Sequence, residues 1–360
     1  MLNRIAILLL LALPLGQAAK RTGAVVTVHP LATKAAEHAF IQGGNAVDAA
    51  VAAALTLGVV DGFNSGIGGG CFMLIRKPDG TFVAIDGRET APQKASRDMF
   101  LHDGKADPDL SRTGALAIGV PGALAAYDLA IREHGNIDLA EHLGQAAAIA
   151  EKGFALDKAY LRRLGQAVEK LRQFPDSARI FLGPDGNAWP SGHSLKQPDL
   201  ARSYRKIARH TADWFYHGPF ALKTEEWMLA NGGLISRADL AAYKARRREP
   251  VRSTYRGFEI VGFPPPSSGG VHVAQILNIL ETFDLRSMPP NSPRFVHHVA
   301  EAMRLALADR AHWLGDADFV PVPKGLASKK YASELARRIH PDKVTNVERH
   351  STPPDADTNL

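Results

Sequence analysis

Residues 43–76 read GGNAVDAAVAAALTLGVVDGFNSGIGGGCFMLIR, and this stretch decides the fold class. Its two leading glycines end one helix, and Asn45 is suited to begin the next. Nearly every side chain at 46–60 is apolar, so this second helix is predicted to be buried on all sides. The glycine-rich run 66–70 leads into the apolar run 72–76, which predicts a tight turn and then a strand. A buried helix that turns directly into a strand indicates a mixed α/β fold.

The same glycine run resembles the phosphate-binding loop of dinucleotide-binding proteins only superficially. Such a loop follows a strand and opens a helix, whereas residues 66–70 follow a helix and open a strand. We therefore predict no nucleotide site here.

Strand and helix patterns alternate on both sides of this stretch, without internal repeats. Residues 23–29 and 257–263 are predicted strands, and 72–76 is predicted to pair with 81–86 across a turn at 77–80. Apolar side chains at three- and four-residue spacing predict helices at 30–42, 122–134, 139–152, 157–171, 222–231, 237–243, 271–283 and 294–314. The sum predicts a sheet with helices packed on it.

The first residues have the pattern of an export signal. An apolar run from Ile5 to Leu15 follows one arginine and precedes small residues, and it is too short to span a bilayer comfortably. We predict a signal peptide at 1–18, cleaved after Ala18, and hence a periplasmic or extracellular protein. A buried first helix is the alternative, but a core helix rarely begins at Met1 without a polar face. No later segment is predicted to span a membrane.

The rest of the chain divides into a folded region and a tail. Residues 19–340 are predicted to fold, since 45% hydrophobic and 22% charged content is typical of globular proteins. Residues 341–360 are polar and rich in Pro, Asp and Thr, which predicts a flexible linker toward a further partner or continuation.

The basic residues do not predict a nucleic-acid partner. A balance of 43 basic to 37 acidic residues gives a net charge of only +6. The one dense cluster has aromatic residues only at its edges, Tyr243 and Tyr255, so we interpret it as a solvated face. Its members are Lys244, Arg246, Arg247, Arg248, Arg252 and Arg256.

Cys71 is the only cysteine, so no intrachain disulfide can form. It opens an apolar run, where a small buried residue is the more common role than a nucleophile.

One predicted helix also carries potential metal ligands, namely His297, His298, Glu301, Asp309 and His312. His298 and Glu301 are three residues apart and share a face, but no second cluster completes a ligand set. We expect a packed helix and no metal.

Several separated motifs are more specific than any of these patterns. They are GGNAVDAA (43–50), GIGGG with FML (66–74), DGRETAP (86–92), RDMF (97–100), GVPG (119–122), PPPSSGG (264–270), ADR (308–310) and LGD (314–316). Together they resemble the γ-glutamyltranspeptidase family over most of the chain after the signal peptide.

The resemblance implies a fold and a chemistry. The fold is the four-layer αββα sandwich of the N-terminal-nucleophile hydrolases, of which this chain is the large-subunit part. Members are made as one precursor that cuts itself into a large and a small subunit, and the new N-terminal Thr then supplies both nucleophile and base. A γ-glutamyl group moves from glutathione to this Thr and then to water or an acceptor amine. The resemblance implies no metal and no cofactor.

The resemblance assigns one site residue to this chain. No Thr-Thr-His string is present, and Thr352 and Thr358 lie in the tail without that context, so the nucleophile is expected beyond Leu360 and no catalytic residue is predicted here. Arg88 matches the family arginine that holds the donor's α-carboxylate, which suits a bidentate guanidinium. For Glu89 two roles remain open, namely orienting Arg88 or standing as a solvated surface charge.

Two positions depart from the family pattern. Gly87 stands where a bulkier residue is usual, which predicts a looser backbone at Arg88. Ala126 replaces a Gly, which predicts slightly less intimate helix packing. We expect weaker substrate binding from these changes, within the same family.

Three functions stay open from the sequence. The chain is the large part of a γ-glutamyltransferase, or of a related acylase with another donor such as a glutaryl group, or a truncated exported homologue that only binds. In the first two, the partner is the small subunit, and without it the chain is expected to expose strand edges and aggregate.

Overall fold

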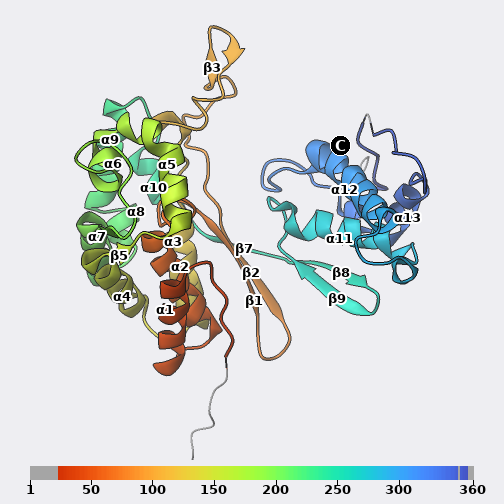
Figure 1. The fold of residues 1–360 in the computed structure, drawn as a ribbon, viewed down its shortest axis with the longest axis horizontal. Helices are drawn as coiled ribbons and strands as arrows, with labels where there is room; N and C mark the ends of the chain where they lie inside the picture. Colours follow the sequence, from red (N-terminus) through yellow and green to blue (C-terminus); the bar gives the residue numbers. More distant parts are fainter. Residues whose placement is uncertain (1–22, 348, 356–360) are drawn as a thin grey trace, which may run out of the picture.

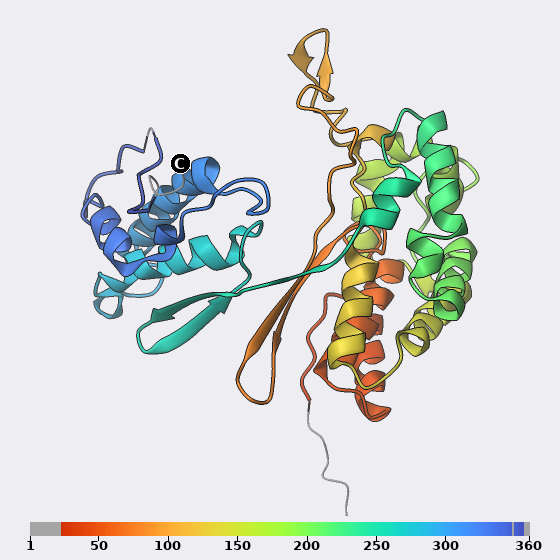
Figure 2. The same ribbon diagram turned by 180° about the vertical axis from the view of Figure 1, so that it is seen from behind.

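The computed structural model describes residues 23–347 and 349–355, so the predicted signal peptide lies outside the described residues. Figures 1 and 2 show two lobes, one built from residues 23–248 and the other from residues 251–355, joined by the segment between them. None of the described helices is long and apolar enough to cross a membrane.

The first lobe is mostly helical. Its central helix, α2 (Ala46–Val60), packs against α1, α3 and α4, and its side chains at Val51, Leu55 and Val59 are fully buried. Asn45 caps this helix, because its side chain accepts from the backbone N–H groups of Val47 and Asp48. The other helices are α1 (Pro30–Ile41), α3 (Ala123–His134), α4 (Leu139–Lys152), α5 (Lys158–Arg172), α6 (Pro175–Phe181), α7 (Pro198–His210), α8 (Asp213–Tyr216), α9 (Pro219–Ala230), α10 (Arg237–Ala242) and the 3-10 turn η1 (Ala115–Ala117).

One antiparallel sheet leads from this lobe toward the other, with the order β1 (Cys71–Arg76), β2 (Phe82–Gly87), β7 (Arg246–Arg248). The predicted hairpin is confirmed, with Cys71 opposite Gly87. β7 pairs with β2 so that Ala84 lies opposite Arg248. Among the described residues, no strand pairs with the outer edge of β1.

Short strand pairs complete the first lobe. β3 (Leu101–His102) and β4 (Lys105–Ala106) form a small hairpin that projects from the body in Figure 1. β5 (Phe154–Ala155) pairs with β6 (Ser194–Leu195) beside α4 and α7.

The second lobe packs three helices beside one hairpin. β8 (Val251–Tyr255) and β9 (Phe258–Gly262) contact α11 (Ser268–Glu281), which packs against α12 (Pro293–Trp313) and α13 (Lys329–Ala336). Gly262 and Gly270 approach so closely that a side chain on either would collide with backbone. The 3-10 turns η2 (Leu285–Ser287) and η3 (Lys324–Ala327) complete it.

The predicted strand at 23–29 is wrong. These residues are extended but belong to no strand, and the Val26 side chain is 96% exposed. A β-branched pattern predicts an extended backbone, but a strand also needs a neighbouring strand. The other three predicted strands and the predicted helices are present, with ends that differ by a few residues.

The described part of the tail has no helix or strand, and two of its residues bond to the second lobe. The backbone N–H of Thr345 donates to Glu301 at 2.7 Å, and that of Ser351 donates to Asp309 at 2.7 Å. The indole N–H of Trp313 donates to the Ser351 carbonyl at 2.8 Å. Thr345 and Ser351 therefore have hydrogen-bond partners on α12, which a prediction from composition does not include.

Candidate functional site

Arg88 follows directly after β2, and its backbone is held on both sides. Its N–H donates to the Asp86 carboxylate at 2.9 Å, and its carbonyl accepts from the Tyr243 hydroxyl at 2.7 Å. Tyr243 directly follows α10, so helix α10 and strand β2 together fix where Arg88 leaves the sheet. Burial raises the pKa of the Tyr243 hydroxyl well above its usual value, so it stays a donor.

The Arg88 side chain is 57% exposed. Its Nε lies 3.4 Å from Glu89 Oε2, and its guanidinium carbon lies 5.9 Å from the centre of the Phe72 ring. In the described part of the chain, neither of its terminal nitrogens donates a hydrogen bond. A guanidinium held at its base and open at its end can bind a carboxylate with two parallel hydrogen bonds.

Glu89 lies between Arg88 and the glycine loop. A side chain on Gly70 would meet the Glu89 carboxylate at 2.8 Å, so this glycine makes room for it. The Gly69 carbonyl accepts from the N–H groups of Gly122 and Ala123, both at 3.0 Å, which ties the loop to the start of α3. Glu89 thus contacts both the Arg88 Nε and the glycine loop, and its side chain is 40% exposed. A pocket of about 540 Å³ lies along this loop, lined also by Glu89, Cys71 and Tyr127.

The two departures from the family pattern lie against each other. A Cβ atom on Gly87 would meet the Ala126 Cβ at 2.5 Å and the Gly122 carbonyl at 3.0 Å. Ala126 is completely buried, so it fills the space that Gly87 leaves. The predictions of a loosened backbone and less intimate packing are therefore wrong, because the missing side chain on one element is replaced by the extra methyl on the other.

Cys71 is a partly buried free thiol. Burial, with the nearby charges of Asp86 and Glu89, raises the pKa of its thiol to about 12. The prediction of a structural thiol is consistent with this, since a nucleophilic cysteine needs a lowered pKa.

The interpretation of the basic cluster as a solvated face agrees with the exposure of Arg246, Arg247 and Arg252, but not with that of Arg248, whose side chain is only 14% exposed. Each of the cluster's arginines also has a partner, which the interpretation did not include. The pairs are Arg246 with Asp318, Arg247 with Glu133, Arg248 with Asp86 and Asp318, Arg252 with Glu259, and Arg256 with the carbonyl of Phe283.

The potential metal ligands of α12 also have separate partners. His298 bonds to the Arg294 carbonyl at 2.7 Å and His297 to the His340 carbonyl at 2.7 Å, while Glu301 accepts from Thr345. Over the described residues, no three His, Cys, Asp or Glu side chains are grouped as a metal site.

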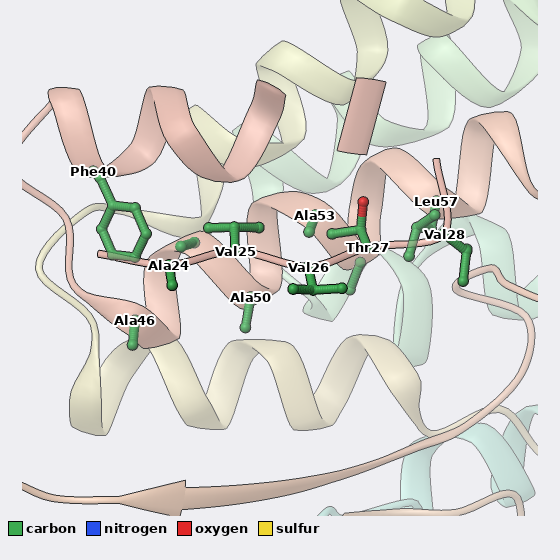
Figure 3. A pocket seen from close by; sticks show the side chains of 12 residues that line it. Ala24, Val25, Val26, Thr27, Val28, Phe40, Ala46, Ala50, Ala53 and Leu57 are labelled. Atoms are coloured by element: carbon green, nitrogen blue, oxygen red, sulfur yellow. The ribbon is translucent and has the colours of Figure 1, made fainter. Parts of the chain in front are cut away.

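A second pocket, of about 460 Å³, is apolar and lies beside the extended segment 24–28. Figure 3 shows this segment running past the side chains of Ala50, Ala53 and Leu57 on α2, with Phe40 of α1 at one end. Val26 and Val28 are both largely exposed. This apolar, unpaired segment has the character of a sheet edge without its neighbour.

Comparison with known proteins identifies the family. The family model described as gamma-glutamyltranspeptidase matches residues 32–359. The chain belongs to the γ-glutamyltranspeptidase family. Its α/β fold is that of a solved γ-glutamyltranspeptidase from Helicobacter pylori, with a TM-score of 0.90 and 38% identity, over 94% of this chain and 97% of that one.

Curated family relatives are longer than this chain. The glutathione hydrolase proenzyme of Escherichia coli is 41% identical over 326 residues, which are 90% of this chain and 56% of that protein. The Acylase ACY 1 proenzyme of a Pseudomonas species (strain SE83) is 43% identical over 320 residues, 87% of this chain and 57% of that protein. The chain therefore spans little more than half the length of these relatives.

Some residues around Arg88 were not predicted as part of the site. Tyr243 and Arg248 contact Arg88 or Asp86 from positions at least 155 residues away in sequence. No local pattern indicates such contacts. The only available signal was the DGRETAP motif, which places Asp86 next to Arg88 without showing what holds it.

Proposed function

We propose that this chain is the large-subunit part of a γ-glutamyltranspeptidase, which transfers or hydrolyses the γ-glutamyl group of glutathione and related γ-glutamyl amides. The observation that carries the proposal is Arg88, with its backbone fixed by Asp86 and Tyr243 and its terminal nitrogens open. The nucleophile is an N-terminal Thr supplied by sequence beyond Leu360.

In this proposal Arg88 anchors the substrate and takes no part in bond making. It binds the donor's α-carboxylate through two charge-assisted hydrogen bonds and so fixes the γ-carbonyl at a set distance. Such an interaction is the same in the ground state and the transition state, so its loss raises KM more than it lowers kcat.

The proposed partner is the small subunit of the same precursor. The open edge of β1, the unpaired segment 24–28 and the apolar pocket beside it support this, because all three are surfaces that a neighbouring strand would cover. The E. coli and Pseudomonas relatives are both named as proenzymes. The pattern at residues 1–18 supports export to the periplasm or the extracellular space.

A related acylase is the second candidate, and the 43% identity to an acylase proenzyme favours it. The two functions differ in the donor, since a γ-glutamyl group carries an α-amino group that a glutaryl group lacks.

The test uses the full-length precursor with this chain at its front. We expect cleavage into two subunits and release of chromophore from a γ-glutamyl anilide, with much slower release from a glutaryl anilide. Arg88→Ala is expected to raise KM for the γ-glutamyl donor, whereas Arg132→Ala, which removes an exposed arginine paired with Asp128 on α3, is expected to leave it unchanged. Faster release from the glutaryl anilide would favour the acylase function. If neither anilide releases product, the remaining function is that of a homologue that only binds.

A further inference from the structure

Arg248 lies between the two lobes and contacts both. It belongs to β7 of the first lobe, and its side chain is only 14% exposed. Its Nε donates to Asp86 Oδ2 at 3.0 Å, while Nη1 and Nη2 donate to the two oxygens of Asp318, both at 2.6 Å. Asp318 lies in the loop that follows α12, in the second lobe.

Asp86 uses its two oxygens in different directions. Oδ2 accepts from Arg248, and Oδ1 accepts from the backbone N–H of Arg88. A chain of hydrogen bonds therefore runs from Asp318 through Arg248 and Asp86 to the backbone of Arg88. Arg246 is a neighbour but no substitute, since it bonds to Asp318 alone and is 61% exposed.

The chemistry of this chain of contacts makes its geometry strict. The Asp86 side chain is only 6% exposed, and a buried carboxylate that loses its cation is left without compensation. The guanidinium spans two carboxylates because its donors form a planar fork, which an ammonium cannot reproduce. Without Arg248, the Asp86 carboxylate is free to turn away from the Arg88 N–H.

We infer that Arg248 and Asp318 are positioning residues, through which the loop after α12 fixes the direction of Arg88. This inference rests on the proposed function, since it gives the Arg88 contact its meaning. It assigns the second lobe a part in donor binding, although its residues lie outside the anchor itself.

The test compares four variants of the full-length protein. Arg248→Gln removes the bridge, Arg248→Lys keeps the charge without the fork, and Asp318→Asn weakens only the outer end. The control is Arg252→Gln, from the same basic cluster, which pairs with Glu259 in the β8–β9 hairpin and lies over the Phe82 ring, at the opposite end of β2 from Arg88. For each, KM and kcat for a γ-glutamyl anilide are measured with the concentration of processed enzyme determined separately.

We expect Arg248→Gln and Arg248→Lys to raise KM about 10-fold, Asp318→Asn about 3-fold, and Arg252→Gln not at all, with kcat per processed enzyme little changed. In an Arg88→Ala background, Arg248→Gln should raise KM no further. A purely structural role would instead lower the amount of processed enzyme and leave KM unchanged, and that result overturns the inference.

The failures can be told apart. If Arg88→Ala leaves KM unchanged, the proposed function fails. If Arg88→Ala raises KM but Arg248→Gln and Asp318→Asn do not, the positioning role alone is overturned. If Arg248→Gln does not fold, the KM of Asp318→Asn tests the inference instead. This variant is expected to fold, because Asp318 is more exposed than Arg248 and its substitution leaves Arg248 paired with Asp86.

Discussion

Gly87→Ala should disturb the packing that presents Arg88, and the structure gives the size of the effect. The new methyl carbon would lie 2.5 Å from the Ala126 Cβ, where carbon atoms prefer about 3.5–4.0 Å. Strand β2 and helix α3 must then separate by roughly 1 Å, since Ala126 is completely buried. Overpacking of this kind costs about 1–3 kcal/mol.

Ala126→Gly in the same molecule should relieve part of that cost. Alone, this change destabilises by about 1 kcal/mol, because glycine is a poor helix former. Combined with Gly87→Ala it removes the nearest obstacle, although the Gly122 carbonyl at 3.0 Å remains. The double variant should therefore be more stable than the sum of the two single effects by about 1 kcal/mol.

The assay is thermal unfolding of the full-length protein, together with KM for the donor. Because Arg88 directly follows β2, Gly87→Ala should also raise KM, and Ala126→Gly should bring it back toward the starting value. Strictly additive changes in Tm and KM would refute the reasoning, since they would show that the two residues do not limit each other.

Three other predictions concern buried groups. Burial alone would raise the pKa of Asp48, but hydrogen bonds from the backbone N–H groups of Asn45, Asn136 and Ile137 outweigh burial and hold this pKa below its usual value. The ionised Asp48 therefore stabilises the fold fully above about pH 4, and this stabilisation is lost as the pH falls through the folded pKa. Asp48→Asn should destabilise the protein near pH 7 and flatten the acid limb of a Tm-against-pH curve; an unchanged limb would contradict this. With its pKa raised to about 12, the Cys71 thiol should resist iodoacetamide at pH 8 in the folded protein and react with it in urea. Equal labelling of folded and unfolded protein, measured by mass spectrometry, would contradict the prediction of an unreactive thiol. Asp309→Asn weakens the bond to the Ser351 N–H, so limited proteolysis should cut the tail faster. The control Ser333→Ala, on the exposed face of α13, should leave the cleavage rate unchanged. Equal cleavage rates for Asp309→Asn and the unsubstituted protein would show that Asp309 does not hold the tail.

Local patterns predicted most of the fold. The apolar run 46–60 and the hairpin at 71–87 are correct because their periodicity and turn residues act over a few neighbours. β7 was missed, since three consecutive arginines have the composition of a solvated surface. The partners of Arg248, Asp86 and Asp318, lie 162 and 70 residues away, and only the folded chain brings them together.

The site was predictable only through its motif. By pattern alone Arg88 is a surface charge, and its 57% exposure agrees with that description. What sets it apart is the way Asp86 and Tyr243 hold its backbone, which depends on tertiary contacts. The same holds for Gly87 and Ala126, whose two departures from the family pattern seemed independent until the structure placed them in contact.

The most direct test of the central claim is a comparison of two donors with two enzymes. The unsubstituted full-length protein and its Arg88→Ala variant are each assayed on a γ-glutamyl anilide and on the matching 4-aminobutyryl anilide, which lacks the α-carboxylate. A charge-assisted pair contributes about 1.5–3 kcal/mol, so the unsubstituted enzyme should favour the γ-glutamyl donor about 10- to 150-fold in kcat/KM, and Arg88→Ala should abolish most of this preference. If the preference survives the substitution, Arg88 does not hold the carboxylate and the account is contradicted.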